Sequence, residues 1–150
     1  MRWLIVVLLV LVSACSAPGT GSNTEPGHNS VGYDVTRDSA VPGLYHASGA
    51  YLPGSNVKPD TVKWRALLNG VEVARKEGYD LAVWSGPKPW TLTQTTIFRG
   101  MNLSAERKAS IPGFAFVIQG YKSGGAHPPS AYPVATLIAE IESEIARAKR

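Results

Sequence analysis

The feature that most constrains this chain is its first fifteen residues, which differ in character from everything that follows. Met1 and Arg2 supply a positive start, and an unbroken apolar run then extends from Trp3 to Val12. A positive start followed by a short apolar stretch and small residues is typical of a secretory signal peptide. The apolar run is too short for a permanent membrane-spanning helix, which needs about 20 residues. We therefore predict that residues 1–14 are a signal peptide and contribute nothing to the fold.

The end of this segment, Val12-Ser13-Ala14-Cys15, resembles the lipobox of bacterial lipoproteins. The resemblance implies that Cys15 carries a diacylglyceryl group, that cleavage occurs before it, and that its new amine receives a fatty acid such as palmitate. The protein would then be held on the non-cytoplasmic side of a membrane by lipid. Ser16 is not the Asp often associated with retention at the inner membrane, so we expect the outer membrane in a host with two membranes. The alternative is an ordinary secreted protein with a Cys near its cleavage site.

The segment after Cys15 is dominated by Gly, Ser, Thr, Asn and Pro from residue 16 to residue 32. Such a composition buries too little apolar surface to offset the entropy lost on ordering the backbone. Residues 33–41 form a transition. We predict a lipidated Cys and flexible tether over residues 15–42 and a single folded domain over residues 43–150.

Two helices are predicted from apolar spacing. Over residues 60–77, apolar side chains recur at the i, i+3, i+4, i+7 spacing of one helix face. This face, which we expect to be buried, comprises Trp64, Leu67, Leu68, Val71 and Ala74. Asp60 stands where an N-cap would, and Gly78 follows as a stop. The second helix is predicted to begin at Pro133, a residue favoured at the first helical position. Its apolar stripe comprises Val134, Leu137, Ile138, Ile141 and Ile145.

Three segments read as strands: residues 44–52, residues 81–85 and residues 113–122. Each is short, rich in aliphatic or aromatic side chains, and bounded by turn residues. We expect Trp84, in the second of these strands, to belong to the core. The order of strands and helices predicts an α+β fold. We expect a small two-layer sandwich with a mixed or antiparallel sheet and two helices on one face.

A long insertion over residues 87–110 interrupts this pattern, and residues 91–98 within it are expected to form a β-arm. Connections longer than about 12–15 residues are uncommon unless they are functional, disordered or structured internally. Trp90 and Arg99 belong to residue types enriched at binding hot spots, so we predict them as possible partner contacts. The alternative is that Trp90 and Phe98 fold back to cover the sheet edge.

The globular part also resembles a group of small uncharacterised bacterial envelope lipoproteins. The matching residues are Ala66-Leu67-Leu68, Gly78-Tyr79, residues 81–84 and residues 114–118, within a span of residues 44–141. The insertion at residues 87–110 departs from that pattern. The resemblance implies envelope location and transfers no catalytic residue.

No catalytic, metal or cofactor motif stands out in the sequence. His28, His46 and His127 lack the spacing that places two metal ligands on one helix face. The net charge of +4 is spread along the chain, whereas nucleic-acid binders concentrate basic residues on one face. We therefore predict a non-enzymatic binding or assembly module that contacts an envelope protein or a cell-wall polymer. The alternative is a small envelope hydrolase whose residues converge only in three dimensions.

Overall fold

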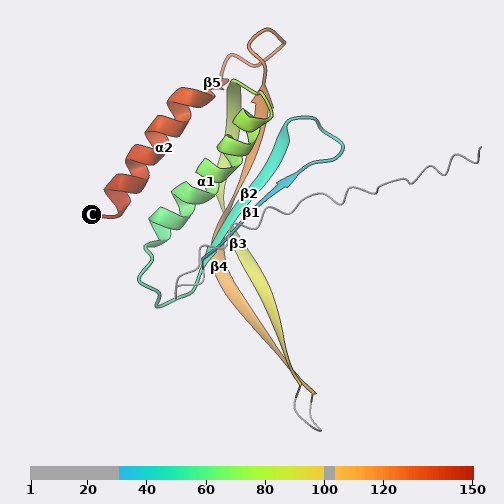
Figure 1. Cartoon of the computed structure of the whole chain (residues 1–150), viewed down its shortest axis with the longest axis vertical. Helices are drawn as coiled ribbons and strands as arrows, with labels where there is room; N and C mark the ends of the chain where they lie inside the picture. Colours follow the sequence, from blue (N-terminus) through green and yellow to red (C-terminus); the bar gives the residue numbers. More distant parts are fainter. Residues whose placement is uncertain (1–30, 100–103) are drawn as a thin grey trace, which may run out of the picture.

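The computed structural model describes residues 31–99 and 104–150, which form one five-stranded sheet and two helices (Figure 1). In the sheet the strands follow the order β1-β2-β4-β3-β5, and all neighbouring strands are antiparallel. The predicted α+β fold is confirmed, and its sheet is antiparallel rather than mixed. The elements are β1 (Val31–Arg37), β2 (Leu44–Tyr51), α1 (Pro59–Lys76), β3 (Leu81–Arg99), β4 (Ser104–Tyr121), β5 (Tyr132–Pro133) and α2 (Val134–Ala148).

The folded domain begins earlier than the sequence suggested. Residues 31–37, placed in the flexible tether of residues 15–42, form β1 and pair with β2 along their whole length. Tyr33 and Val35 alternate with more polar neighbours and pack against the core, which is how an edge strand gains stability. The predicted domain start at residue 43 is therefore wrong. Cys15 and the rest of residues 1–30 lie outside the described residues.

Helix α1 follows the predicted apolar spacing closely. Its first residue is Pro59 and its N-cap is Lys58, so Asp60 lies in the first turn, where it pairs with Lys63 at 2.7 Å. The predicted cap at Asp60 is therefore wrong, because a proline at the first position already sets the helical φ. At the other end Gly78 has a φ of +84° and ends the helix as predicted.

Helix α1 lies unusually close to the sheet because Gly70 faces it. A Cβ at Gly70 would lie 2.3 Å from Ile118 Cδ1 and 2.8 Å from the Cβ of Ala47. Both neighbours are completely buried. The missing side chain at Gly70 thus lets α1 pack directly on β2 and β4.

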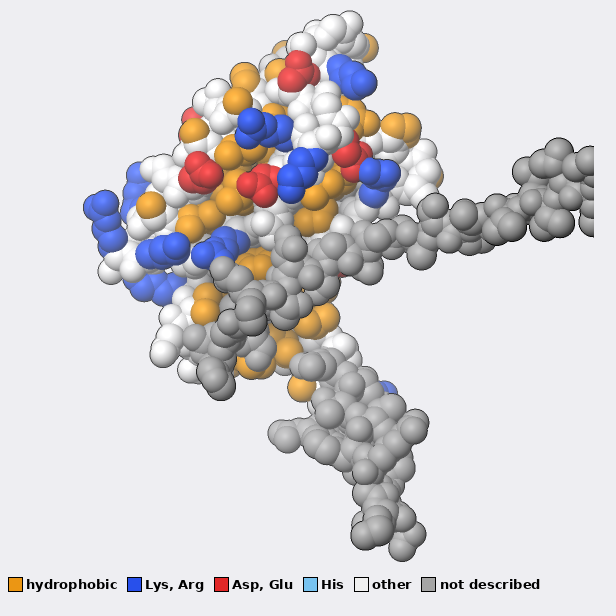
Figure 2. Space-filling view, viewed as in Figure 1, with side chains coloured by type: hydrophobic (Ala, Val, Ile, Leu, Met, Phe, Trp, Pro, Cys, Tyr) orange, Lys and Arg blue, Asp and Glu red, His pale blue; other side chains and the backbone are white. Residues whose placement is uncertain are grey.

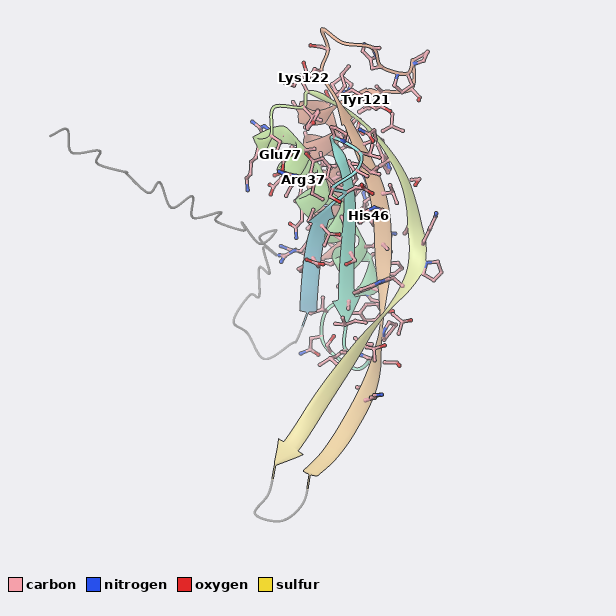
Figure 3. All side chains as sticks on the ribbon, turned by 90° about the vertical axis from the view of Figure 1, so that its right-hand side faces the viewer. Arg37, His46, Glu77, Tyr121 and Lys122 are labelled. Carbon is pink, nitrogen blue, oxygen red and sulfur yellow. The ribbon has the colours of Figure 1, made fainter. Side chains whose placement is uncertain are left out.

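Helix α2 begins after Pro133 and runs back alongside α1 on the same side of the sheet (Figures 1 and 3). Its start is tied to the start of β3, since the Val134 amide donates to the carbonyl of Asp80, the residue before β3, at 2.9 Å. The predicted stripe of α2 is buried in full. The core between helices and sheet comprises Tyr45, Ala47, Ala66, Leu67, Val71, Ala74, Ala82, Phe116, Ile118 and the five buried residues of α2.

Strands β3 and β4 form a hairpin that is far longer than the sheet to which they belong. Their pairing runs from Leu81–Tyr121 to Arg99–Ser104, with one irregularity between Ser85 and Lys88. Strand β2 pairs with β4 only as far as Gly113. Beyond that point the hairpin continues as a two-stranded ribbon, which we call the arm: residues 91–99 and residues 104–112. Figures 1 and 3 show it projecting from one end of the body.

Candidate functional site

The arm accounts for most of the predicted insertion. Residues 87–99 and 104–110 of the insertion belong to β3 and β4, so they continue the sheet rather than interrupt it. The β-arm predicted for residues 91–98 is confirmed as part of β3. A two-stranded ribbon is marginally stable by itself in water. The described chain adds no third strand to the arm, which makes the arm the first candidate for partner contact.

Trp90 lies at the root of the arm, in the last row where three strands meet. It pairs with Gly113 of β4, and Gly113 pairs in turn with Ala50 of β2. Ala50 is 1% exposed, whereas Trp90 is half-buried. Trp90 therefore has a packed part and an accessible part, and both interpretations of it from sequence remain open.

Gly113 is required at this row by the close approach of β2. A Cβ on Gly113 would lie 2.2 Å from the Gly49 carbonyl oxygen and 3.0 Å from the Ala50 Cα. Both neighbours are backbone atoms, so no change of side-chain rotamer could make room. The joint between arm and body therefore depends on this glycine.

Arg99, the second predicted contact, is placed at the opposite end of the arm, where it pairs with Ser104. Its side chain lies outside the described part of the structure. Nine residues of strand separate it from Trp90, which corresponds to about 30 Å at about 3.3 Å per residue. The two predicted residues therefore belong to one arm but not to one local site.

Trp84 is more exposed than the sequence suggested. Its apolar neighbours predicted a core position, but 36% of Trp84 is exposed, and its ring meets Tyr132 edge-on at 6.2 Å. The reason is that β5 pairs only with Leu81 and Ala82, so β3 becomes an edge strand just before Trp84.

The end of the body opposite the arm carries a polar network built on Glu77, the residue after α1. Arg37 at the end of β1 donates to Glu77, and the Tyr45 hydroxyl donates to the same carboxylate at 2.5 Å. Figure 3 shows Arg37 and Glu77 side by side there. Partial burial raises the pKa of Glu77, but the hydrogen bonds from Tyr45 and Arg37 outweigh it and hold the pKa below its usual value. Burial, together with the bond to Glu77, raises the pKa of Tyr45. This network joins β1, β2 and α1.

A second network at that end joins the start of β3 to the turn after β4. Asp80 accepts hydrogen bonds from the Ser123 hydroxyl and, at 2.7 Å, from the Ser123 amide. These bonds lower the pKa of Asp80. The Ser123 hydroxyl donates to the Asp80 carboxylate and not to a histidine. The network is a structural clamp.

The two histidines of the described chain differ in their surroundings: His127 lies near the Asp80–Ser123 clamp and helps to lower the pKa of Asp80, whereas His46 lies beside Asp38. His46 on β2 is 3.9 Å from Asp38 in an exposed pair. Two backbone amides, those of Ala40 and Val41, lower the pKa of Asp38. His127 contacts the Pro128 carbonyl at 3.2 Å. In residues 31–99 and 104–150, no three His, Cys, Asp or Glu side chains gather as a metal site would require.

A shallow groove of about 400 Å³ separates the two helices. Figure 2 shows this face, where acidic and basic side chains are interspersed over apolar ones. The charged residues that line the groove are Arg65 and Glu72 of α1 and Glu142 of α2. The remaining lining residues are Leu68, Asn69 and Ile145.

Comparison with known proteins adds no family: the chain matches no family model, no curated protein and no solved structure. Neither helix of the described chain is long and apolar enough to cross a membrane.

Proposed function

We propose that the protein is a lipid-anchored module of the cell envelope that binds a partner through its β-arm. Cys15 carries the lipid, the residues after it act as a tether, and the body of the domain holds the arm in a fixed position. The activity is non-enzymatic: the module assembles with, or positions, another envelope component.

The observation that carries this proposal is the arm itself. Loops and projections held on a rigid scaffold commonly carry binding residues. Here β3 and β4 leave the sheet after the row of Trp90 and Gly113 and continue for nine paired residues on each strand. An isolated two-stranded ribbon gains little from its own pairing, so a partner that adds a strand or covers a face would stabilise it.

The anchor is supported by the lipobox-like residues before Cys15 and by the chemistry of lipid attachment. Each buried CH₂ contributes about 0.8 kcal/mol, and one acyl chain gives only reversible binding. Two or three chains on one cysteine therefore give lasting attachment. The chain has one cysteine, so Cys15→Ser should abolish metabolic fatty-acid labelling and leave the precursor uncleaved. Labelling that persists in this variant would exclude the anchor.

The binding role is tested by replacing Trp90. Trp90→Ala in the full chain should reduce capture of partner from envelope membranes while the melting temperature changes little. Trp84→Ala is the matched control, because Trp84 is an exposed tryptophan of the same strand that lies on the body. Equal loss of binding in both variants would contradict a contact made by the arm and not by the body. A large drop in melting temperature with binding retained would show that Trp90 is a packing residue.

No specific observation favours the alternative, a small envelope hydrolase. The groove between the helices brings Glu72 and Glu142 together without a histidine, and the Ser123 hydroxyl donates to Asp80 rather than to a histidine.

A further inference from the structure

The arm has two outer edges, and they differ in chemistry. Natural sheets protect exposed edges from pairing with other chains by placing charges, prolines or bulges along them. On β4 the arm carries Glu106, Arg107 and Lys108, and it ends at Pro112. This edge therefore holds the usual protective residues.

The edge of β3 is protected only next to the body. There the register shifts between Ser85 and Lys88, and the strand contains Pro87 and Pro89. From Trp90 to Phe98 the same strand has no proline, no glycine and no charge, and it is rich in threonine and other residues of high β-propensity. In the described chain, β5 pairs with β3 only at Leu81 and Ala82. The outer edge of β3 is thus left open over the arm, with backbone donors and acceptors in an extended conformation.

We propose that this edge, residues 90–98 of β3, pairs antiparallel with the same edge of a second copy of the chain, joining two arms into a four-stranded sheet. The inference gives a partner to the proposed binding role of the arm, and it rests on that role but not on the lipid at Cys15.

The charge pattern of the strand fits a second copy in antiparallel orientation. Arg99 is the first charged residue after Lys88. Antiparallel pairing of residues 90–98 about a two-fold axis sets Arg99 of each copy opposite Pro89 of the other, next to Lys88, so no two like charges are directly opposite. Parallel pairing in register would set the two Arg99 residues directly opposite each other. Like charges directly opposite one another destabilise paired strands. A two-fold contact also uses the same surface on both copies, which is the commonest way for a chain to self-associate.

The shape of the molecule fits the same arrangement. The arm projects clear of the body (Figures 1 and 3). Antiparallel pairing therefore places the two bodies at opposite ends of the joined arms, about 30 Å apart for nine residues at about 3.3 Å each. Two copies can pair along the whole edge without their helices meeting.

Cysteine cross-linking in membranes tests this pairing. Single cysteines replace Thr93, Gln94 or Thr95 on β3, and Ala109 or Ser110 on β4, in the full chain; the unaltered chain, whose only cysteine is Cys15, is the control. Two-fold pairing of residues 90–98 brings Gln94 opposite its own copy, so mild oxidation should give a disulfide dimer most readily from the Gln94→Cys chain and little at the β4 positions. Equal cross-linking on both strands, or none on β3, overturns the inference.

A charge substitution supplies the second measurement. Gln94→Lys sets two lysines directly opposite each other in the proposed dimer, so it should abolish co-purification of two differently tagged copies. Ala109→Lys, at the register partner of Gln94 on the other strand of the arm, should preserve co-purification. Both variants should melt like the unaltered chain. Dimers that persist in Gln94→Lys overturn the inference. A β3 cysteine that captures a different protein and never its own copy also overturns it, while leaving the proposed binding function intact.

Discussion

Gly113→Ala is the substitution whose effect the structure defines most sharply. The new Cβ would lie 2.2 Å from the Gly49 carbonyl oxygen, whereas an ordinary van der Waals contact begins at 3.4 Å, so β4 must move away from β2 by about 1 Å. Overpacking in a core typically costs about 1–3 kcal/mol. The neighbours of Gly113 are backbone atoms, so we expect the upper part of that range, about 2–3 kcal/mol. For a domain of this size about 1 kcal/mol shifts the melting temperature by about 3–6 °C, which predicts a drop of about 10 °C.

Gly32→Ala is the control for this substitution. Gly32 is an exposed strand glycine in β1, and a Cβ there meets no atom within 4 Å. Replacing such a glycine reduces the entropy of the unfolded chain and stabilises by about 0.4–1 kcal/mol. Thermal and urea unfolding followed by circular dichroism would measure both variants. A Gly113→Ala chain that melts with or above the unaltered chain would refute the reasoning about the joint.

Two further predictions concern the body. Leu67→Ala should cost about 2–5 kcal/mol of unfolding free energy in urea titrations, because Leu67 is 1% exposed, whereas Leu68→Ala should cost clearly less because Leu68 is half-buried beside the groove. Asp80→Asn should lower stability at neutral pH, since Ser123 holds the pKa of Asp80 below its ordinary value. Because the pKa of Asp80 is lower in the folded chain, its ionised carboxylate stabilises the folded state at pH values above the unfolded pKa of about 3.9. That stabilisation is lost as the pH falls through the folded pKa. Urea titrations at several pH values should therefore show the difference from the unaltered chain shrinking below about pH 4, and a constant difference would contradict the role of Ser123.

The helices could be predicted from the sequence because their signals are local. In α1 the apolar spacing and the glycine at position 78 were enough to place the helix to within a residue at each end. The prediction of the buried face is only partly confirmed: Leu67, Val71 and Ala74 are in the core, while Trp64 and Leu68 are partly buried at its margin. Gly70 explains why the buried face differs from the predicted one. Helix α1 turns this glycine toward the sheet, and the spacing of large apolar residues does not reveal a face centred on a glycine.

The edges of the sheet could not be predicted in the same way, because their stability comes from pairing with distant residues. Strand β1 has only Tyr33 and Val35 to contribute to the core, next to a segment of low hydrophobicity. The arm was recognised in β3 from its threonine-rich pattern. Its other strand, residues 104–111, contains Glu106, Arg107 and Lys108, and that polar composition gave no sign of a strand.

The central claim, that the arm makes the contact and the body only holds it, is tested most directly by shortening the arm. Strand β3 is ended at Leu92 and β4 is begun at Ile111, which are register partners, and an Asn-Gly turn joins them. Chemical cross-linking in membranes is then compared between the full chain and the shortened one. We predict that the full chain forms a cross-linked complex, with its own copy or another protein, and that the shortened chain loses it while melting at a similar temperature. The same cross-linked complex from the shortened chain would contradict the account.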